Sequence, residues 1–346
     1  MIFANLASKS SPWQNTDSGS LFISTRVRFA RNLAGFYFPN QASPAAQSRV
    51  RKKVFEGIAT VKRWKDAGKL ELEELDITDR KFLIERHLSS YDLVFTERVA
   101  GLVMGEGETA GIMVNEEDHL RMQVLGKGLS LEETLEEASS IEKEISAVFD
   151  FAHSDDFGFL TSCPTNAGTG LRISFLAHLP ALVMSGYMGE VIESLARVGV
   201  ASRGVYGEAT KPLGGFFQIS NQVTLGVSQR DIIEKLKAIS KQIEDASDKA
   251  LDDLVSKRKT EMEDKIYRSY GVLQYARRIS YEELINRISD IRLGLSMGMA
   301  LPLDGERLNN MLFLAQPAHI EERNGALLSP SERDEKRSEF LRETMG

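Results

Sequence analysis

Arginines at the ends of predicted elements are the first feature that could do chemistry. These are Arg26, Arg28, Arg121, Arg172 and Arg203. Arginine stays charged and presents a planar fork of donors, which suits triphosphate oxygens and the charge of a phosphoryl group in transfer. Taken singly, each position is better explained as a surface arginine with a salt bridge at the rim. Five such positions together indicate a convergent anion site.

Carboxylates in two short runs could hold a cation opposite that anion. Glu117 lies in the run NEEDH at 115–119, and Glu208 closes RGVYGE at 203–208. A guanidinium has a pKa above ~12, so its nitrogen becomes nucleophilic only after losing a proton. Two carboxylates can hold the planar cation, and one can accept the proton. A thiolate at Cys163 would stabilise the cation further. The alternative is a solvated acidic turn.

A loop rich in glycine and threonine, CPTNAGTGLR at 163–172, precedes a predicted helix. Its backbone N–H groups could face phosphate. It lacks the Gly-Lys-Ser/Thr of a Walker A loop, and a plain turn before a helix is the alternative.

Four motifs in this order, STRVR at 24–28, NEEDHLR at 115–121, CPTNAGTGLR and RGVYGE, resemble the phosphagen (guanidino) kinases. The resemblance covers roughly residues 20–255. It implies an α+β fold, with a glutamine-synthetase-like antiparallel sheet flanked by helices. It also implies ATP as substrate, with Mg²⁺ bridging the phosphates.

The resemblance assigns roles to individual residues. Catalytic roles fall on Glu117, Glu208 and Cys163. Nucleotide-binding roles fall on Ser24, Thr25, Arg26, Val27, Arg28, His87, Arg121, Arg172, Ile173, Ser174, Phe175, Leu176, Arg203, Gly204, Val205, Tyr206, Gly207 and Glu208.

Two departures from the phosphagen kinases favour the bacterial protein arginine kinases. The first motif starts at Ser24, with no helical domain of the usual size before it, and a helical module follows the last motif. An open site could admit an arginine on a protein surface. The resemblance then implies protein substrates with exposed arginines, a homodimer, an McsA-like activator and a Clp-type protease that degrades the marked proteins.

The C-terminal run RDEKRS at 333–338 resembles the RDxxRA motif of these kinases. In them the motif forms an allosteric pocket for phosphoarginine, which implies that role for Arg333, Asp334 and Arg337. Arg333 and Arg337 lie one helical turn apart and can face one anion. Ser338 replaces the family's alanine, and a solvated charged face is the alternative.

Two further functions compete with a protein arginine kinase. A free-guanidino kinase would phosphorylate free arginine instead of protein. A non-catalytic adaptor would bind phosphoarginine or a protease, but it has no physical need for Glu117, Glu208, Cys163 and the five arginines together.

The elements that must position these residues follow from the periodicity of apolar residues. Strands are predicted at 21–27, 91–95, 98–105, 111–115, 120–125, 200–206, 215–220 and 222–226. Helices are predicted at 45–66, 131–148 with a capping box of Ser130 and Glu133, 171–184, 188–198, 230–258, 262–278, 281–299, 304–316 and 330–344. Mixed elements without a βαβ repeat favour α+β. We divide the chain into a catalytic domain at 1–255 and a helical dimerisation and regulatory domain at 256–346.

Composition excludes several other functions. A net charge of −7 argues against general nucleic-acid binding. The single cysteine excludes an intrachain disulfide, and the five histidines lack metal-ligand spacing, so no structural metal site is expected. The sequence shows no membrane-spanning run and no secretory signal, which predicts a cytoplasmic protein.

Overall fold

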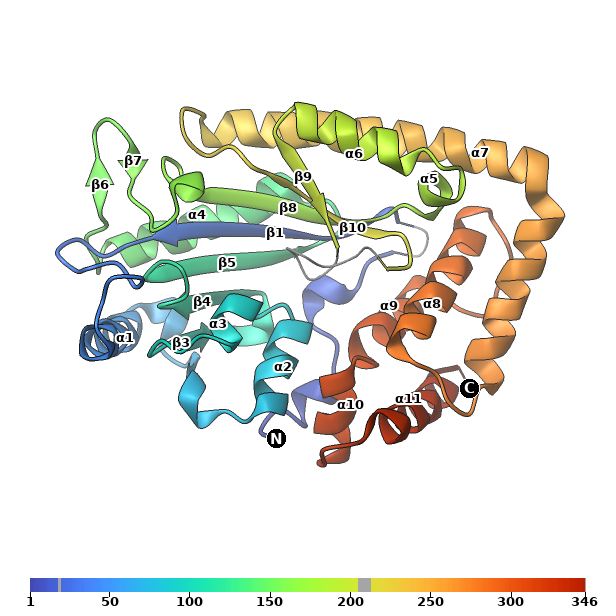
Figure 1. The fold of residues 1–346 in the computed structure, drawn as a ribbon, viewed down its shortest axis with the longest axis horizontal. Coiled ribbons are helices and arrows are strands. Elements are labelled where there is room, and N and C mark those ends of the chain that lie inside the picture. The colour runs from blue at the N-terminus through green and yellow to red at the C-terminus, as the bar shows by residue number, and fades with distance from the viewer. Residues whose placement is uncertain (18–19, 205–212, 346) are drawn as a thin grey trace.

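An eight-stranded antiparallel sheet forms the centre of the computed structural model, which describes residues 1–17, 20–204 and 213–345 (Figure 1). The strand order is β2-β3-β4-β5-β1-β8-β10-β9. The bounds are β1 Phe22–Arg31, β2 Gly68–Glu71, β3 Gly101–Met104, β4 Ala110–Val114, β5 Leu120–Lys127, β8 Leu171–His178, β9 Val200–Arg203 and β10 Phe216–Asn221. A separate hairpin pairs β6 His153–Ser154 with β7 Gly158–Phe159. The predicted α+β class is confirmed.

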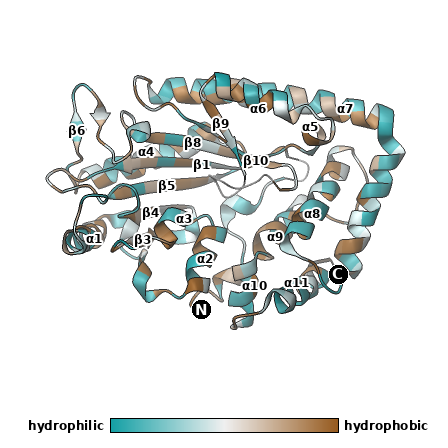
Figure 2. Cartoon of the chain, in the orientation of Figure 1, coloured by the Kyte–Doolittle hydropathy of each residue, from teal (hydrophilic) through white to brown (hydrophobic). Residues whose placement is uncertain are grey.

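The two faces of the sheet differ because side chains alternate along each strand. On β1, Val27 and Phe29 are fully buried in the main hydrophobic core, whereas Arg26 and Arg28 belong to the opposite face. Helices cover the apolar face: α1 Pro44–Ile58, α4 Leu131–Ser146, α5 Pro180–Met184, α6 Met188–Arg197 and the first part of α7 Gln229–Tyr275. Figure 2 shows hydrophobic and hydrophilic residues alternating along β5 and β8.

A helical module follows the sheet. Helix α7 runs along one side of the molecule and bends at Arg258, whose φ of −139° is not helical (Figure 1). The module continues with α8 Tyr281–Ser296, α9 Gly305–Leu314, α10 Pro317–Asn324 and α11 Pro330–Met345, which share a second core with Trp13 and Leu176. The division at 255/256 falls inside α7 and stays a prediction.

Helices α2 Ile77–Glu85 and α3 Tyr91–Val94 lie between the sheet and the module. Their neighbourhood contains a third core, in which Phe82 and Leu83 meet Ala318 of α10. The short 3₁₀ turns are η1 Leu6–Ser8, η2 Pro12–Gln14, η3 Lys62–Trp64, η4 Leu72–Glu74, η5 Glu106–Glu108 and η6 Pro164–Asn166. Within the described ranges, no helix is both long and apolar enough to cross a membrane.

Several predicted elements are wrong. Most of the helix predicted at 171–184 is strand β8, because its backbone forms hydrogen bonds with β1 on one side and β10 on the other. A short helix, α5, begins only at Pro180. The strand predicted at 91–95 is helix α3, because the Ser90 hydroxyl caps its N-terminus by accepting from Leu93 N–H at 3.1 Å. Residues 222–226 form no strand, and β1 extends past Val27 to Arg31.

Other local predictions fail at element ends. The capping box at Ser130 does not form, since the Ser130 hydroxyl meets Thr134 and its N–H donates to the Thr25 hydroxyl at 3.0 Å. The helices predicted at 230–258 and 262–278 correspond to the two parts of α7, which meet at the kink at Arg258. Helix α10, which begins with Pro317, was missed.

We predict that Arg292→Leu destabilises the protein by about 3 kcal/mol, because a buried acceptor and a partly buried one lose their donor. Arg292 donates to Asn309 Oδ1 and to the Ser20 carbonyl, each at 2.9 Å, and so joins α8, α9 and the N-terminal segment. Urea unfolding measures the change. Arg268→Ala, which removes an exposed pair with Asp264, is the control and should change the free energy of unfolding by less than about 0.5 kcal/mol. Equal effects of the two variants on the free energy of unfolding would contradict the role of Arg292 in joining these segments.

Candidate active site

The five arginines singled out from the sequence line one cavity of about 480 Å³ on the polar face of the sheet. Strand register brings them together, because Arg172 on β8 lies opposite Arg28 on β1. Arg121 on β5 lies opposite Ala30, two residues farther along the same face of β1. Arg203 on β9 pairs with Gln218 on β10, which also lines the cavity.

Crowding of like charges gives the cavity a strong preference for an anion. Burial, followed by repulsion from Arg121 and Arg172, lowers the pKa of Arg26 to about 9. Burial and the neighbouring arginines hold the pKa of Arg28 well below its ordinary value. Among the described residues, the buried Nε atoms of Arg26 and Arg28 have no hydrogen-bond partner. A polyanion would satisfy both the charge and these donors.

Glu116, which the sequence reasoning missed, is the counter-ion of the cluster. It is 1% exposed and forms an ion pair with Arg121. Burial opposes its ionisation, but Arg121, the Ser90 hydroxyl and Glu117 N–H outweigh burial and lower its pKa. The carboxylates of Glu116, Glu117 and Asp118 raise the pKa of Arg121 and outweigh the opposing effect of burial. The position of Glu116 next to Glu117 in the acidic run was the one sequence signal for this role. That run, however, is also typical of a solvated turn.

Glu117 and Cys163 line the cavity together with the arginines. Burial, opposed by Arg121 and reinforced by Asp118 and Glu116, raises the pKa of Glu117 above its ordinary value. Asn166 Nδ2 donates to Glu117 Oε2 at 3.0 Å and fixes that oxygen. The Cys163 sulfur lies 3.0 Å from the Thr165 hydroxyl. The cavity therefore places a carboxylate with a raised proton affinity beside a cationic cluster.

Asp118 joins the acidic turn to the cysteine loop. Its Oδ1 accepts from Asn32 Nδ2 at 2.7 Å and from Ser162 N–H at 2.6 Å. Asn115 starts the turn with a φ of 57°, and its side-chain amide donates to the carbonyls of Gln47 and Val99. These bonds set the position of Glu117 relative to Cys163.

The glycines of the 163–172 loop allow close packing. At Gly168, with φ of 94°, an added Cβ would lie 2.5 Å from the Thr224 carbonyl oxygen. At Gly170, with φ of 58°, it would lie 2.6 Å from that of Ala30. The loop leads into strand β8, so it does not present a helix N-terminus to phosphate. The turn interpretation accounts for the glycines, although Thr165 and Asn166 line the cavity.

His87 also lines the cavity, from the segment after α2. Its backbone is left-handed, with φ of 59°, and it is 8% exposed. Burial, with smaller contributions from Arg26 and His319, lowers its pKa to about 3. The imidazole is therefore neutral near pH 7.

The other described residues that were predicted to bind the nucleotide are not among those that line this cavity. Thr25, Val27, Ile173 and Phe175 alternate with the arginines on the strands, and the last three pack in the main core. Leu176 packs in the second core, and Ser174 accepts from Gln218 Nε2 at 3.1 Å. Ser24 is buried on β1, and Gly204 follows β9. Val205, Tyr206, Gly207 and Glu208 lie outside the described residues.

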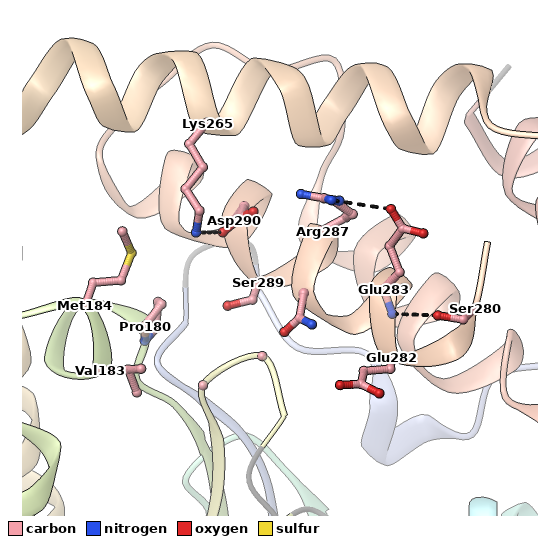
Figure 3. A pocket seen from close by; sticks show the side chains of 13 residues that line it. Pro180, Val183, Met184, Lys265, Ser280, Glu282, Glu283, Arg287, Ser289 and Asp290 are labelled. Carbon is pink, nitrogen blue, oxygen red and sulfur yellow. Dashed lines mark hydrogen bonds and ion pairs between the residues drawn. The ribbon is translucent and has the colours of Figure 1, made fainter. Parts of the chain in front are cut away.

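A second cavity of about 660 Å³ lies between α5, the 213–215 turn and α8 (Figure 3). Its charged side chains are largely paired with one another: Lys265 with Asp290, and Arg287 Nη2 with Glu283 Oε1 at 3.3 Å. None of the five arginines lines it. The chemistry therefore points to the arginine cavity.

Comparison with known proteins matches most of the catalytic region and most of the helical module. Residues 49–250 match the model of the ATP:guanido phosphotransferase C-terminal catalytic domain, and residues 259–346 match that of the protein-arginine kinase McsB C-terminal domain. The chain is 38% identical over 323 residues to the protein-arginine kinase of Halothermothrix orenii, covering 93% of this chain and 92% of the relative. It is 40% identical over 328 residues to that of Moorella thermoacetica, covering 94% of each. The chain belongs to the protein-arginine kinase family.

Solved guanidino kinases share the fold. The duplicated taurocyamine kinase from Schistosoma mansoni, with bound transition state analog components, matches at 27% identity and a TM-score of 0.59. The match covers 68% of this chain and 34% of that one. A lombricine kinase matches at 21% identity and a TM-score of 0.59, covering 71% and 75%, and shows the fold alone. The predicted antiparallel sheet with flanking helices and a helical C-terminal region is confirmed.

The RDxxR motif of this family member lies on α11 with its charges engaged. Arg337 is 1% exposed and donates to the carbonyls of Ala315 at 2.8 Å and Ile279 at 2.9 Å, and to Asp334 at 2.6 Å. Arg333 pairs instead with Glu321 Oε1 at 3.3 Å. The two arginines thus hold different partners, and an allosteric phosphoarginine pocket stays a prediction.

We predict that Arg28→Met leaves the ligand-free protein at least as stable as the wild type, because one member of a repelling cluster is removed. ATP should stabilise the wild type by about 2.7 kcal/mol at about a hundredfold excess over Kd, and the variant much less. Thermal unfolding with and without ATP measures both effects. The exposed Arg268→Ala is the control and should keep the full ATP effect. An unchanged ATP effect in Arg28→Met would contradict an anion site here.

Proposed function

We propose that this chain is an ATP-dependent protein-arginine kinase whose reaction takes place in the arginine cavity. The observation that carries the proposal is that five arginines, Glu117 and Cys163 line one cavity. Membership of the protein-arginine kinase family supports the same activity. In the reaction a guanidinium nitrogen forms a bond to the γ-phosphorus, the bond from that phosphorus to the β–γ bridging oxygen breaks, and ADP leaves.

The arginines would bind the triphosphate and stabilise the transition state. Phosphoryl transfer needs mainly positioning and stabilisation of charge on the phosphoryl oxygens. Guanidinium groups fixed on strands provide both without reorganising. Mg²⁺ commonly binds through substrate phosphates and one or two carboxylates. Mg²⁺ would therefore enter on the ATP phosphates. Among the described residues, no group of three or more acidic, histidine or cysteine side chains could hold a metal ion.

Glu117 would hold the substrate guanidinium and accept its proton. Its raised pKa favours proton uptake, and Asn166 keeps one oxygen oriented. Cys163, on the same cavity wall, would contact the cation. A paired role for Glu208 is a prediction from the sequence resemblance, since that residue lies outside the described ranges.

A protein substrate fits the rim of the cavity. Tyr91 and Asp92 on α3 line it and are exposed, Tyr91 to 48%. The exposed Phe95 ring stacks on Tyr91 at 6.0 Å between centroids. An aromatic surface at the mouth could contact the chain around a target arginine.

The biological setting is the finer part of the proposal. Action in the cytoplasm, marking of substrates for a Clp-type protease, a homodimer, an McsA-like activator and allosteric control through Arg333, Asp334 and Arg337 all derive from the resemblance alone. The presence of acid-labile phosphoarginine in proteins of a cell that contains the chain, and its loss without it, tests this setting.

We predict that Glu117→Gln reduces protein-arginine phosphorylation about 10²- to 10⁴-fold, because the amide cannot accept the proton. Purified protein, Mg-ATP and an arginine-rich protein are combined, and acid-labile phosphate is measured. Binding of ATP should persist, since Glu117 is not among the cationic groups. Glu133→Gln, on the exposed face of α4, is the control. Rapid turnover of free arginine with none of protein would establish a free-guanidino kinase instead.

We also predict an acid limb in the rate set by Glu117. Because its pKa is raised, the carboxylate becomes protonated, and the rate falls, at a higher pH than for an ordinary glutamate. Asn166→Ala removes a hydrogen bond that lowers this pKa, so the limb should move to still higher pH. Initial rates of ADP formation avoid the acid lability of the product. A limb that stays in place or moves to lower pH in Asn166→Ala would refute the assignment of Glu117 as the base.

A further inference from the structure

The backbone of His87 is held in a costly conformation at the wall of the arginine cavity. A non-glycine residue in the left-handed region persists only where its surroundings fix it. From the sheet, Gln123 Nε2 on β5 donates to the carbonyls of His87 at 2.8 Å and Leu88 at 3.1 Å. The centroids of the Trp13 ring and the His87 imidazole lie 5.1 Å apart.

The helical module holds the other side of the same turn. Gln316 Nε2, just before α10, donates to the carbonyl of Glu85 at 3.1 Å. The Glu85 carboxylate accepts from Ala318 N–H at 2.9 Å, and from His319 N–H at 3.0 Å and Nδ1 at 2.9 Å. Glu85 thereby satisfies the first N–H groups of α10, where a negative charge is favoured. All of these groups are buried.

A ring from α9 completes the contact. Phe313 meets His87 edge to face, with 6.1 Å between ring centroids. Residues 313–319 therefore contact residues 85–87 in three ways: through the Phe313 ring, through the Gln316 amide and through the N-terminus of α10. The described side chains that line the arginine cavity, by contrast, come from residues 26–220.

We propose that the helical module is part of the nucleotide site, because Gln316 and Glu85 act as positioning residues that hold His87 against the bound nucleotide. The inference rests on the proposed function, since it assigns the cavity to ATP. Loss of either contact would release the left-handed turn, and His87 would leave the cavity wall. The arginines, which are fixed on strands, would stay in place. The expected defect is therefore weaker nucleotide binding with a preserved rate of transfer.

The test measures ATP affinity by calorimetry, KM and kcat for protein phosphorylation, and the thermal midpoint, all on the full-length chain. Gln316→Ala and Glu85→Gln should raise Kd and KM for ATP about tenfold while kcat stays within about twofold. Gln316→Ala, which leaves the Glu85 contacts to α10 intact, gives the answer if Glu85→Gln does not fold.

Thr78→Val is the matched control. Thr78 is buried in the same interface between α2 and α10, and its hydroxyl donates to Glu321 Oε2 at 3.2 Å, at the end of α2 away from His87. This variant should lower the thermal midpoint about as much as Gln316→Ala does and leave the ATP affinity unchanged.

A double-mutant cycle separates positioning from general stability. Glycine adopts the left-handed region without strain, so His87→Gly removes both the ring and the need to hold the turn. In that background Gln316→Ala should change the ATP affinity by less than about twofold. Additive losses would show that Gln316 does not act through His87.

The outcomes distinguish the two proposals. A wild-type chain that binds no ATP overturns the proposed function. A wild-type chain that binds ATP, with Gln316→Ala and Glu85→Gln lowering only the thermal midpoint as Thr78→Val does, overturns only the positioning role.

Discussion

Repulsion among guanidinium groups on one face of a sheet is the constraint on which the rest of this structure depends. Arg26, Arg28 and Arg172 lie on adjacent strands, and burial keeps water from screening them. Among the described residues, the buried carboxylate of Glu116 forms an ion pair with the cluster at Arg121. The fold must hold these charges together before any ligand arrives, and this requires a rigid support.

The antiparallel sheet is that support. On β1, β5 and β8, the arginines alternate with apolar residues on the opposite face, and these apolar residues belong to the main core. Packing of Val27 and Phe29 thus offsets part of the unfavourable charge on the other side of the same strand. The arginines cannot relieve their repulsion by moving apart, because they are attached to paired strands of the sheet. The sheet therefore keeps the site together.

Part of this arrangement could be predicted from the sequence. Motifs identified the arginines, Glu117 and Cys163, and they depend on residue type and order, which the sequence records directly. The element under Arg172 was predicted wrongly, because a short apolar run has no periodicity that separates a buried strand from a helix. Glu116 was missed because its role depends on Arg121, whose approach is set by folding. Gln316 and Glu85 lie 231 residues apart in the chain, and no local pattern announces that contact.

The positions of these long-range contacts connect the C-terminal motif to the site. Arg333 forms its ion pair with Glu321 on α10, and the N-terminus of that helix binds Glu85. Arg337 donates to the carbonyls of Ala315 and Ile279, so α11 is joined to the segment before α10. An anion that drew Arg333 away from Glu321 would therefore act on the helix that holds the turn at His87. Under the proposed positioning role, control of the arginine cavity from the C-terminal motif would need only a shift of α10, because the arginine cluster itself is fixed on the sheet.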